Sequence, residues 1–219
     1  MAVINLEVIA MENLLLLGKE ILMDESKVLL HYNPGEDWLD YWMPKSGKWH
    51  CADGCLYGEE PGNFGGILLT KEFFPQNVLM SFTVSAVLPA TRDLNAVFCS
   101  RWNEETNNLG LSYVCGLNGW YEHKSGLEKQ VDDGTVTLYS TTSLYHYTPG
   151  TEVRMTVGAI DGHSFMFADD VLISEMWDPD PIIGGHIGFS AYCTKLRIRD
   201  IEIREINWRP RNHRYDPEF

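Results

Sequence analysis

The chain has 219 residues, and its 17 basic and 31 acidic side chains give a formal net charge of −14. A hydrophobic fraction of 44% is that of a globular protein and excludes a disordered chain except at the ends. The isoelectric point, near 4.8, argues against a nucleic-acid partner, because the one candidate basic patch is the short stretch from Trp208 to Arg211. We therefore expect a single globular domain over residues 1–219 that does not bind nucleic acid.

The first residues and the cysteines predict a soluble, cytoplasmic protein. No Lys or Arg precedes Lys19, so the basic start of a secretory signal is missing. The longest apolar run, Leu14 to Leu17, is far shorter than the roughly 20 residues that cross a bilayer, and we expect no membrane partner. Of the five cysteines only Cys51 and Cys55 are close in sequence, which excludes a full disulfide framework, and this pair lacks a second pair of zinc ligands.

The N-terminal segment, residues 1–47, carries two competing patterns. Ile4, Val8, Met11 and Leu15 have the spacing of one helix face, whereas Val28 to Leu30 suits a short strand. From about Lys48 onward, short segments of alternating apolar and polar residues are separated by Gly, Pro, Asn and Asp. This arrangement is typical of an antiparallel all-β domain.

Two segments show the alternation most clearly. In the first, Leu79 to Val87, apolar residues share one face and Ser or Thr the other, which predicts a half-buried strand. In the second, apolar residues alternate from Val153 to Ala159, and Asp161 and Gly162 supply a tight turn. Phe165 and Phe167 then continue the apolar face on the return strand, so we predict a hairpin.

The last long segment changes its alternation halfway. Leu196 and Ile198 fall on one parity, whereas Ile201 and Ile203 fall on the other, so we predict a β-bulge near Asp200. We expect the interleaved charged side chains of this strand to face solvent and discourage edge pairing. Residues 209–219 contain two prolines and few apolar residues, which predicts a C-terminal surface arm.

The order of these pieces from Trp49 to Ile206 resembles the concanavalin A-like lectin and glucanase superfamily. The early pieces look like the core of the 3-keto-disaccharide hydrolase-like and YesU-like families, in which a strand ending in arginine follows a loop, here Pro89 to Asn95. The resemblance implies an all-β, concanavalin A-like jelly-roll β-sandwich of two curved antiparallel sheets, whose concave face takes up sugars in many relatives. The matching pieces, in chain order, are Trp49–Leu56, Gly65–Phe73, Val78–Val87, Ala96–Arg101, Ile160–His163, Phe167–Asp170 and Gly185–Phe189.

Two enzyme patterns of this superfamily are missing. Glucanases carry Glu-x-Asp-x-x-Glu or a near variant on one strand, but the nearest acidic cluster, Glu175 to Asp180, includes Pro179 and ends in the wrong residue, which argues for a loop. The alginate-lyase type uses a Gln-x-His strand, and neither Gln76 nor Gln130 has a His two residues on. One fold hosts lectins, hydrolases and lyases, so the resemblance does not decide the reaction.

The densest group of aromatic and polar side chains lies between Arg101 and Tyr147. Pyranose rings stack on aromatic side chains and their hydroxyl groups need charged or amide partners, so this composition predicts a sugar groove. Each of these aromatics could equally be a core or rim residue, and Arg101 could equally form a salt bridge. We expect Arg101, Trp102 and the stretch Trp120 to His123 to share one pocket on the concave face. The predicted substrate-binding residues are Arg101, Trp102, Trp120, Tyr121, His123, Tyr145 and Tyr147.

Acid–base chemistry needs a positioned side chain that exchanges a proton near neutral pH. The predicted catalytic residues are Glu122, His146 and Glu59, with Glu60 as a further candidate. We predict no metal or other cofactor. A structural calcium is the remaining option, because three acidic turns could supply oxygen ligands, although all three also fit ordinary turns: Asp132-Asp133-Gly134, Asp169-Asp170 and Asp178-Pro179-Asp180.

The sequence thus predicts an intracellular protein that binds, and processes by hydrolysis or elimination, an oligosaccharide from polysaccharide breakdown. The first alternative is a non-catalytic carbohydrate-binding or assembly module, which would have the aromatic groove without an acid–base group of shifted pKa. The second is a protein-interaction sandwich, which would expose an apolar patch. A homo-oligomer remains open.

Overall fold

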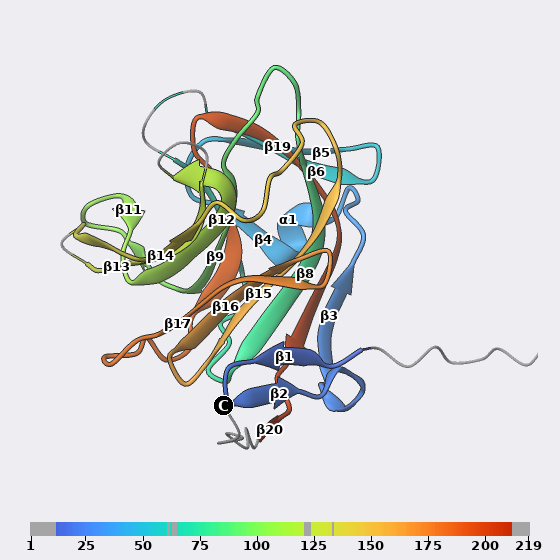
Figure 1. Cartoon of the computed structure of the whole chain (residues 1–219). Coiled ribbons are helices and arrows are strands. Elements are labelled where there is room, and N and C mark those ends of the chain that lie inside the picture. Colours follow the sequence, from blue (N-terminus) through green and yellow to red (C-terminus); the bar gives the residue numbers. More distant parts are fainter. Residues whose placement is uncertain (1–11, 61, 63–64, 121–123, 133, 212–219) are drawn as a thin grey trace, which may run out of the picture.

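The computed structural model describes residues 12–60, 62, 65–120, 124–132 and 134–211. Two large antiparallel sheets pack face to face with the hydrophobic core between them (Figure 1). This confirms the predicted all-β sandwich of two antiparallel sheets. The elements are β1 (Leu14–Leu16), β2 (Lys19–Ile21), η1 (Met23–Glu25), β3 (Val28–Tyr32), α1 (Trp38–Tyr41), β4 (Trp42–Pro44), β5 (Lys48–Ala52), β6 (Cys55–Glu60), β7 (Gly66–Thr70), β8 (Val78–Ala86), β9 (Leu94–Ser100), β10 (Trp102–Asn103), β11 (Asn108–Leu109), β12 (Ser112–Trp120), β13 (Lys124–Gln130), β14 (Val136–Thr142), β15 (Val153–Ile160), β16 (His163–Ala168), β17 (Val171–Trp177), β18 (His186–Ala191), β19 (Thr194–Glu205) and β20 (Trp208–Pro210).

The strand order mixes local and distant pairings. One sheet has the order β14-β13-β12-β9-β18-β7-β4, and the other has the order β17-β16-β15-β8-β19-β6-β5, with β3 also paired to β19. Hairpins such as β12–β13 join neighbours in sequence, whereas β18 lies between β9 and β7, far from both in the chain. These distant pairings decide which side chains meet on the face of each sheet.

Alternation along each strand builds the core. In β12, Tyr113, Cys115 and Leu117 are fully buried and point toward the opposite sheet, where Phe82 and Met155 belong to the same apolar cluster. Successive side chains of a strand point to opposite faces, so the intervening residues of β12 face outward. Burial of these side chains supplies the main stabilising free energy of the sandwich.

The predicted hairpin is confirmed, but its two aromatic residues face the other way. Strands β15 and β16 pair across Asp161 and Gly162, whose φ angles of 51° and 84° suit the two-residue turn. In this register Val157 lies opposite Met166, which points into the main core with it. Phe165 and Phe167 therefore point to the outer face, where they join a second apolar cluster with the N-terminal strands.

The segment predicted as a half-buried strand is buried on both faces. Every residue of β8 is buried, including the Ser and Thr side chains of its polar face. Ser81 is hydrogen-bonded to Thr156 of the neighbouring strand, with 2.7 Å between the hydroxyl oxygens. The period of two was correct, but β8 is central in its sheet and its polar face is covered by other side chains.

Strand β19 contains the predicted bulge. Its pairing with β8 shifts between Arg199 and Glu202, and Asp200 has a φ of 52°. The expectation that its charged residues protect a sheet edge is wrong, because β19 pairs with β8 on one side and with β6 and β3 on the other. Its charges are instead partnered locally, as in the ion pair of Arg199 with Glu152, at 2.6 Å.

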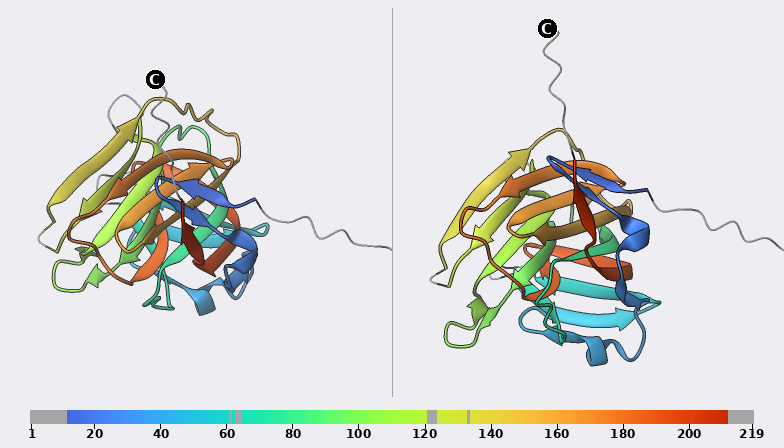
Figure 2. Two further views of the ribbon diagram at one scale, coloured as in Figure 1. Left: turned by 60° about the horizontal axis from the view of Figure 1, so that its bottom comes forward. Right: turned by 90° about the horizontal axis from the view of Figure 1, so that it is seen from below.

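The two ends of the described chain meet in a small third sheet of order β1-β2-β20, seen at the bottom of Figure 1. Leu15, which the helical alternative included, lies in strand β1, and the strand predicted near Val28 is β3. Arg209 and Pro210 of the predicted C-terminal arm pair with β2, while residues 1–11 and 212–219 lie outside the described residues. Figure 2 shows this small sheet lying across the eight-stranded sheet.

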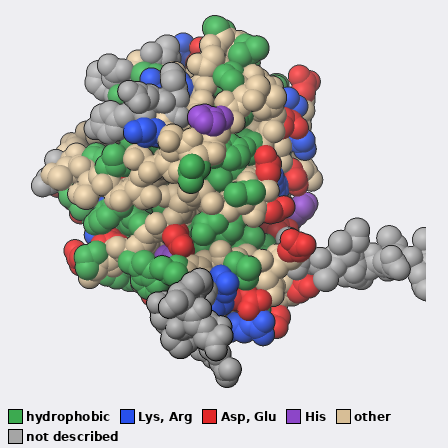
Figure 3. Space-filling model, viewed as in Figure 1, with side chains coloured by type: hydrophobic (Ala, Val, Ile, Leu, Met, Phe, Trp, Pro, Cys, Tyr) green, Lys and Arg blue, Asp and Glu red, His purple; other side chains and the backbone are tan. Residues whose placement is uncertain are grey.

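The surface reflects the acidic composition. On the face shown in Figure 3, acidic side chains gather mainly along the right-hand side and hydrophobic side chains occupy the middle. In the part of the chain that the structure describes, no helix is long and apolar enough to cross a membrane.

Candidate functional site

The outer face of the seven-stranded sheet, which we call the open face, carries two hollows that predicted site residues line. The outer face of the eight-stranded sheet has a hollow of about 580 Å³ beside Ser81, Arg154 and Asp170, but no predicted site residue lines it. The short β10–β11 hairpin stands over the middle of the open face, where Trp102 and Leu109 pack on an apolar strip. Cross-strand pairing places one row of outward residues side by side across the sheet: Glu128, Val114, Val97, Gly188, Leu69 and Met43. The hairpin leaves one hollow on each side of it.

The first hollow, which we call the Trp120 hollow, has a volume of about 420 Å³. This is within the roughly 300–1,000 Å³ that is usual for ligand pockets. Its described lining contains two carboxylates but no Lys, Arg or His, so it can accept hydrogen bonds from a neutral polar ligand. The side chains that give it its chemistry are Asp93, Asn95, Trp120, Glu128, Gln130, Ser190 and Tyr192.

Asn95 is the unusual residue of this hollow. Its side chain is buried, and its Oδ1 has no hydrogen-bond partner. A Cβ atom on Gly116 of the adjacent strand would lie 1.9 Å from this oxygen, so only glycine leaves room for it. A buried carbonyl without a donor costs free energy, but this oxygen has almost no accessible surface, so a ligand in the hollow does not reach it directly.

Asp93 is held in place beside Asn95. It is buried, has a φ of 59°, and forms an ion pair with Arg92 Nε. Arg92 also donates from its terminal nitrogen to the carbonyl of Gly119, at 3.1 Å. A positive φ in a residue other than glycine is uncommon and accompanies positions fixed by their surroundings. The guanidinium therefore ties the β8–β9 loop to the end of β12.

Trp120 and Glu128 form the third part of the hollow. Trp120 Nε1 donates to Glu128 Oε2 at 2.8 Å, which fixes the indole against the carboxylate. The ring lies close to Gly126, where any side chain would also meet the carbonyl of Ser140. Burial raises the pKa of Glu128, the hydrogen bond from Trp120 opposes this, and the charge of Asp93 raises the pKa further. Glu128 therefore holds its proton more strongly than an ordinary glutamate.

The second hollow, which we call the Arg101 hollow, lies on the other side of the hairpin and has a volume of about 330 Å³. Arg101 donates to the carbonyl of Ile183 at 3.0 Å, and its guanidinium carbon lies 5.8 Å from the centre of the Phe73 ring. The lining residues are Met43, Lys45, Leu69, Lys71, Arg101, Trp102, Glu104 and His186. Cationic side chains dominate this hollow, in contrast to the Trp120 hollow.

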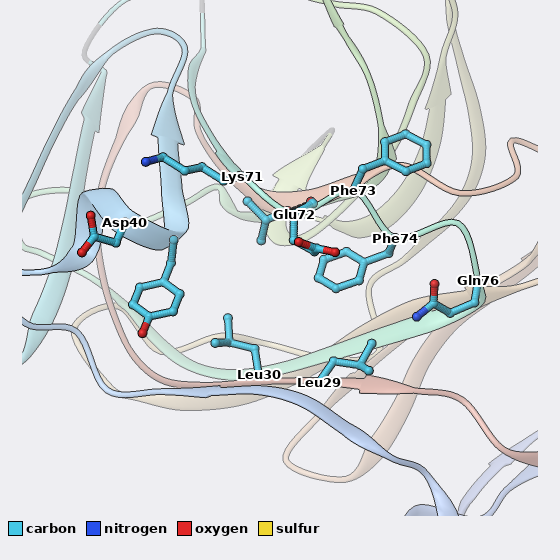
Figure 4. A pocket seen from close by; sticks show the side chains of 10 residues that line it. Leu29, Leu30, Asp40, Lys71, Glu72, Phe73, Phe74 and Gln76 are labelled. Atoms are coloured by element: carbon cyan, nitrogen blue, oxygen red, sulfur yellow. Dashed lines mark hydrogen bonds between the residues drawn. The ribbon is translucent and has the colours of Figure 1, made fainter.

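A third hollow, of about 360 Å³, lies at the edge of the sandwich beside α1. Figure 4 shows Leu29 and Leu30 on one side of it and Phe74 on the other, with the side chains of Lys71 and Phe73 spread toward its two ends. Its walls are mainly apolar, but Asp40, Lys71, Glu72 and Gln76 also line it, and Figure 4 shows the Glu72 carboxylate beside the Phe74 ring. None of the predicted site residues lines this hollow.

The structure brings some predicted binding residues onto one face but not into one pocket. Arg101 follows β9 as expected, and Trp102 and Trp120 both lie on the open face. Arg101 and Trp102 line one hollow and Trp120 the other. Three of the predicted residues, Tyr121, Glu122 and His123, lie outside the described residues.

The predicted residues after β14 line neither hollow. The Tyr147 hydroxyl accepts from the amide of Ala86 and donates to the carbonyl of Thr151, both at 2.9 Å, so it fastens a loop. Tyr145 packs against the main core, and burial raises its pKa to about 12. His146 is exposed between these two tyrosines. The alternation along this segment was too weak to indicate that its aromatics serve the core.

Glu59 lies on the outer face of the other sheet. Its side chain is half exposed and pairs with Lys195 of β19 at 3.4 Å. The neighbouring candidate, Glu60, accepts a hydrogen bond from the amide of Gly62 at 2.8 Å. Neither residue lines the Trp120 hollow.

Sequence reasoning missed Asp93, Asn95 and Glu128. A signal was present for Asn95, because an amide inside the otherwise apolar run of β9 needs a reason. Glu128 follows Leu127 in a plain alternating strand, and nothing local distinguishes it from a solvent-facing glutamate. Only the pairing of β12 with both β9 and β13 brings these residues together.

The acidic turns considered for calcium have other partners. Asp178 forms an ion pair with Lys129 at 2.8 Å, and Asp169 accepts from the amide of Arg154 at 2.9 Å. Asp133 lies outside the described residues. Among the described residues, no group of three or more His, Cys, Asp or Glu side chains is placed to hold a metal ion.

Comparisons with known proteins bear on the fold. No known family model and no curated protein matches the sequence. Among solved structures, the chain is similar to a protein of unknown function with a galectin-like fold from Bacillus subtilis, at 14% identity and a TM-score of 0.65, over 82% of this chain and 96% of that one. It is also similar to the carbohydrate-binding module CBM66 from Bacillus subtilis, at 11% identity and a TM-score of 0.61, over 74% of this chain and 94% of that one.

A third similar structure is the exoplasmic/lumenal domain of VIP36 with bound Ca²⁺ and Man3GlcNAc, at 10% identity and a TM-score of 0.55, over 91% of this chain and 95% of that one. At these identities the likeness concerns the fold alone. The chain has a galectin-like and concanavalin A-like β-sandwich, as the resemblance from Trp49 to Ile206 implied.

Proposed function

We propose that the protein binds an oligosaccharide in the Trp120 hollow. The observation that carries the proposal is the indole of Trp120, which its hydrogen bond to Glu128 fixes in a hollow that also has the aromatic side chain of Tyr192. A sugar ring can stack on this indole while its hydroxyl groups donate to Glu128 or to the amide oxygen of Gln130. A ligand that supplies several donors around an apolar ring is the class of molecule that fits this set.

The aromatic side chains supply the apolar part of the recognition. Trp120 is fixed by its bond to Glu128, and Tyr192 stands exposed on the opposite rim. A fixed indole loses little conformational entropy when a pyranose ring stacks on it. Similar folds in proteins named for carbohydrate binding, such as CBM66, support the proposal by analogy.

The test is a binding screen of neutral and uronate-containing oligosaccharides by calorimetry. Trp120→Ala should weaken binding by tenfold or more and Tyr192→Ala by less, because each removes part of the aromatic surface on which a sugar ring can stack. The matched control is Trp177→Ala, which removes an exposed indole from the other sheet. A wild-type protein that binds none of the saccharides, or variants that bind as the wild type does, would overturn the proposal.

A second candidate function is cleavage of the bound saccharide, and the raised pKa of Glu128 favours it. A carboxyl group whose pKa is raised by burial and by a neighbouring carboxylate is a candidate general acid. Glu128→Gln keeps the shape of the side chain, so it should retain affinity within a few-fold while the rate falls by about 10²–10⁴. The rate is measured by release of reducing ends for hydrolysis and by ultraviolet absorbance of an unsaturated uronate for elimination. A wild type that binds but gives neither signal is a non-catalytic module.

The proposal also places the protein in the cytoplasm. All five cysteines are free thiols, which suits a reducing compartment. Fractionation of cells that express the full chain tests this location, and recovery outside the cytoplasm would contradict it.

A further inference from the structure

The Arg101 hollow gathers positive charge in a protein that is strongly negative overall. Its lining has Lys45, Lys71 and Arg101 against the single carboxylate of Glu104, whereas the whole chain has 31 acidic and 17 Lys or Arg side chains. We propose that this hollow binds the anionic group of an acidic saccharide, a uronate carboxylate or a sulfate ester. The inference takes from the proposed function only that the ligand is a saccharide.

Several strands deliver these cations to one corner of the open face. Met43 of β4 lies opposite Leu69 of β7, and both point outward. Lys45 and Lys71 directly follow the ends of these two strands, and both line the hollow. His186 begins the adjacent strand β18, and the pairing therefore sets the charges around one apolar floor.

Arg101 is fixed in a geometry that leaves donors free. One terminal nitrogen donates to the carbonyl of Ile183 at 3.0 Å, and the guanidinium lies over the Phe73 ring. Among the described residues, the structure records no carboxylate paired with this guanidinium. Its remaining N–H groups form the planar fork that binds a carboxylate or sulfate in two places.

His186 is oriented by a similar pair of contacts. The carbonyl of Glu72 lies 3.0 Å from Nδ1 and can only accept, so Nδ1 carries the proton. The imidazole also meets the Phe73 ring edge-on, at 5.5 Å between centroids. These contacts fix the ring. With the proton on Nδ1, Nε2 of the neutral imidazole is an acceptor, so it can bind a sugar hydroxyl group next to the anion rather than the anion itself.

Lys45 has a partner that an anion can replace. Its ammonium lies 2.8 Å from Glu104, whose side chain is 75% exposed, and 5.8 Å from the centre of the Trp102 ring. An ion pair with so exposed a carboxylate contributes little stability, so exchange of Glu104 for a ligand anion costs little. The ring of Trp102 beside it offers a stacking surface for the sugar that bears the anion.

The two hollows would give a bound oligosaccharide a direction. The carboxylates Asp93 and Glu128 repel an anionic unit from the Trp120 hollow, and the cations attract it to the Arg101 hollow on the other side of the β10–β11 hairpin. The net charge of −14 repels anions at long range, so selective binding of an acidic sugar requires a local cationic site of this kind.

The experiment compares ligands that differ only in charge. Four ligands are titrated separately into ¹⁵N-labelled protein. They form two pairs: tetragalacturonate with its full methyl ester, and a sulfated carrageenan tetrasaccharide with its desulfated form. The indole N–H resonance of Trp102 reports on the Arg101 hollow and that of Trp120 on the Trp120 hollow. We expect at least one acid form to bind about tenfold more tightly than its neutral partner at low salt and to perturb Trp102. The stronger pair identifies the anion, and added salt should reduce the difference.

Three variants locate the effect. Arg101→Gln and Lys71→Gln should each reduce the preference for the acid form to about threefold or less. Lys195→Gln makes the same change in net charge on the other sheet and should leave the preference unchanged. Thermal melting of each variant checks folding. If Arg101→Gln is unstable, Lys71→Gln still tests the inference, because Lys71 is exposed and its replacement should not disturb folding.

The outcomes separate the two proposals. If the neutral ester perturbs Trp120 and the acid form binds no better, the proposed function stands and this inference fails. If the acid form perturbs Trp102 while no neutral saccharide perturbs Trp120, the inference stands and the proposed function fails. Acetate or inorganic sulfate that perturbs Trp102 as strongly as the acid saccharides would show an adventitious anion site and overturn the inference.

Discussion

The two outer faces of the sandwich are built from similar strands, but other parts of the chain cover one face and leave most of the other open. The outer face of the eight-stranded sheet is largely occupied by the protein itself: β1, β2 and β20 cover Phe165 and Phe167, and its charged side chains pair with one another. The open face of the seven-stranded sheet carries only the small β10–β11 hairpin, and hollows remain on both sides of it. Most charged groups of the first face therefore pair with one another, although one hollow beside Ser81 and Arg154 remains there, whereas polar groups line both hollows of the second face.

This difference explains why composition alone pointed to the wrong carboxylates. Glu59 and Glu128 both belong to alternating strands, but Glu59 is half exposed beside Lys195 whereas Glu128 is partly buried beside Trp120. Burial without a cationic partner raises the pKa of Glu128, whereas Glu59 forms an ion pair with Lys195 at the surface. The surroundings of a carboxylate, rather than its position in a strand, decide its chemistry.

The largest expected effect comes from deleting Asp200, which removes the bulge of β19. The deletion turns either Ile201 and Ile203 or Leu196 and Ile198 away from the core. Each isoleucine that becomes exposed should lower the free energy of unfolding by about 1.5–3 kcal/mol. We expect loss of cooperative unfolding, measured by urea denaturation. Asp200→Gly is the control, because glycine tolerates the φ of 52° and should unfold cooperatively. A deletion variant as stable as the wild type would show that the register is wrong.

A buried ion pair behind the open face gives the next effect. The Lys129 ammonium lies 2.8 Å from Asp178, which also accepts from the Tyr113 hydroxyl at 2.6 Å. Burial would raise the pKa of Asp178, but Lys129, Tyr113 and the amide of Asp180 together lower it, so the carboxylate stays ionised. Lys129→Ala leaves that charge buried and unpaired and should reduce the free energy of unfolding by about 3–5 kcal/mol.

The double variant Lys129→Met with Asp178→Asn separates charge from packing. It removes both charges and should be more stable than Lys129→Ala, because no unpaired ion remains. The loop that follows Asp178 contains Ile183, whose carbonyl holds Arg101, so Lys129→Ala should also loosen the Arg101 hollow. Equal stabilities of the single and double variants, measured by denaturant unfolding, would contradict this account.

The attachment of the small sheet to the covered face should depend on pH. Buried His163 lies 3.2 Å from the ammonium of Lys19 through Nδ1 and 2.8 Å from Glu175 through Nε2. Burial lowers the pKa of His163, the hydrogen bond to Glu175 opposes this, and the charge of Lys19 lowers the pKa further. A lowered pKa in the folded state gives stability that is complete above the unfolded value of about 6.5 and declines as pH falls below it.

The measurement is the free energy of unfolding of the wild type between pH 5 and 7.5, with His163→Gln as the control. The variant lacks the titrating ring, so its stability should change less over this interval. Hydrogen exchange of the β1, β2 and β20 amides should accelerate at low pH in the wild type. Identical pH profiles of the two proteins would show that His163 does not contribute.

The smallest effect is expected from a surface pair on the covered face. Lys195 and Glu59 are each about two-fifths exposed, at 38% and 42%. Lys195→Ala should therefore change the free energy of unfolding by less than about 1 kcal/mol. Saccharide affinity should not change, because the pair lies on the opposite outer face from both hollows. A large loss of affinity would place the ligand on the wrong sheet.

Local alternation was sufficient to predict individual strands. Strand β8, the β15–β16 hairpin and the bulge at Asp200 were all evident as runs of apolar and polar residues. The burial of each face was less predictable: Phe165 and Phe167 continue the alternation, but their face was assigned wrongly because the N-terminal strands that cover them are distant in sequence. A pattern of period two defines two faces without saying which one meets the core.

The candidate site was predicted only in part for the same reason. Trp102, Trp120 and Arg101 were found because their residue types are rare and suited to sugars, and they lie on one sheet face. Asp93 lies in the loop between β8 and β9, Asn95 in β9 and Glu128 in β13. They form one site only because β12 pairs with both β9 and β13. No single segment of sequence contains that information.

The sequence by itself determined an acidic, all-β chain with strands, turns and a bulge at definite positions, because these depend on interactions between residues close in the chain. The tertiary structure decided the order of the strands, the covering of one outer face and the gathering of the polar side chains on the other. Those features come from pairings such as β18 with β9 and β7, which join residues far apart in sequence. Desolvation and charge contacts between such residues raise the pKa of Glu128 and make the Arg101 hollow positive.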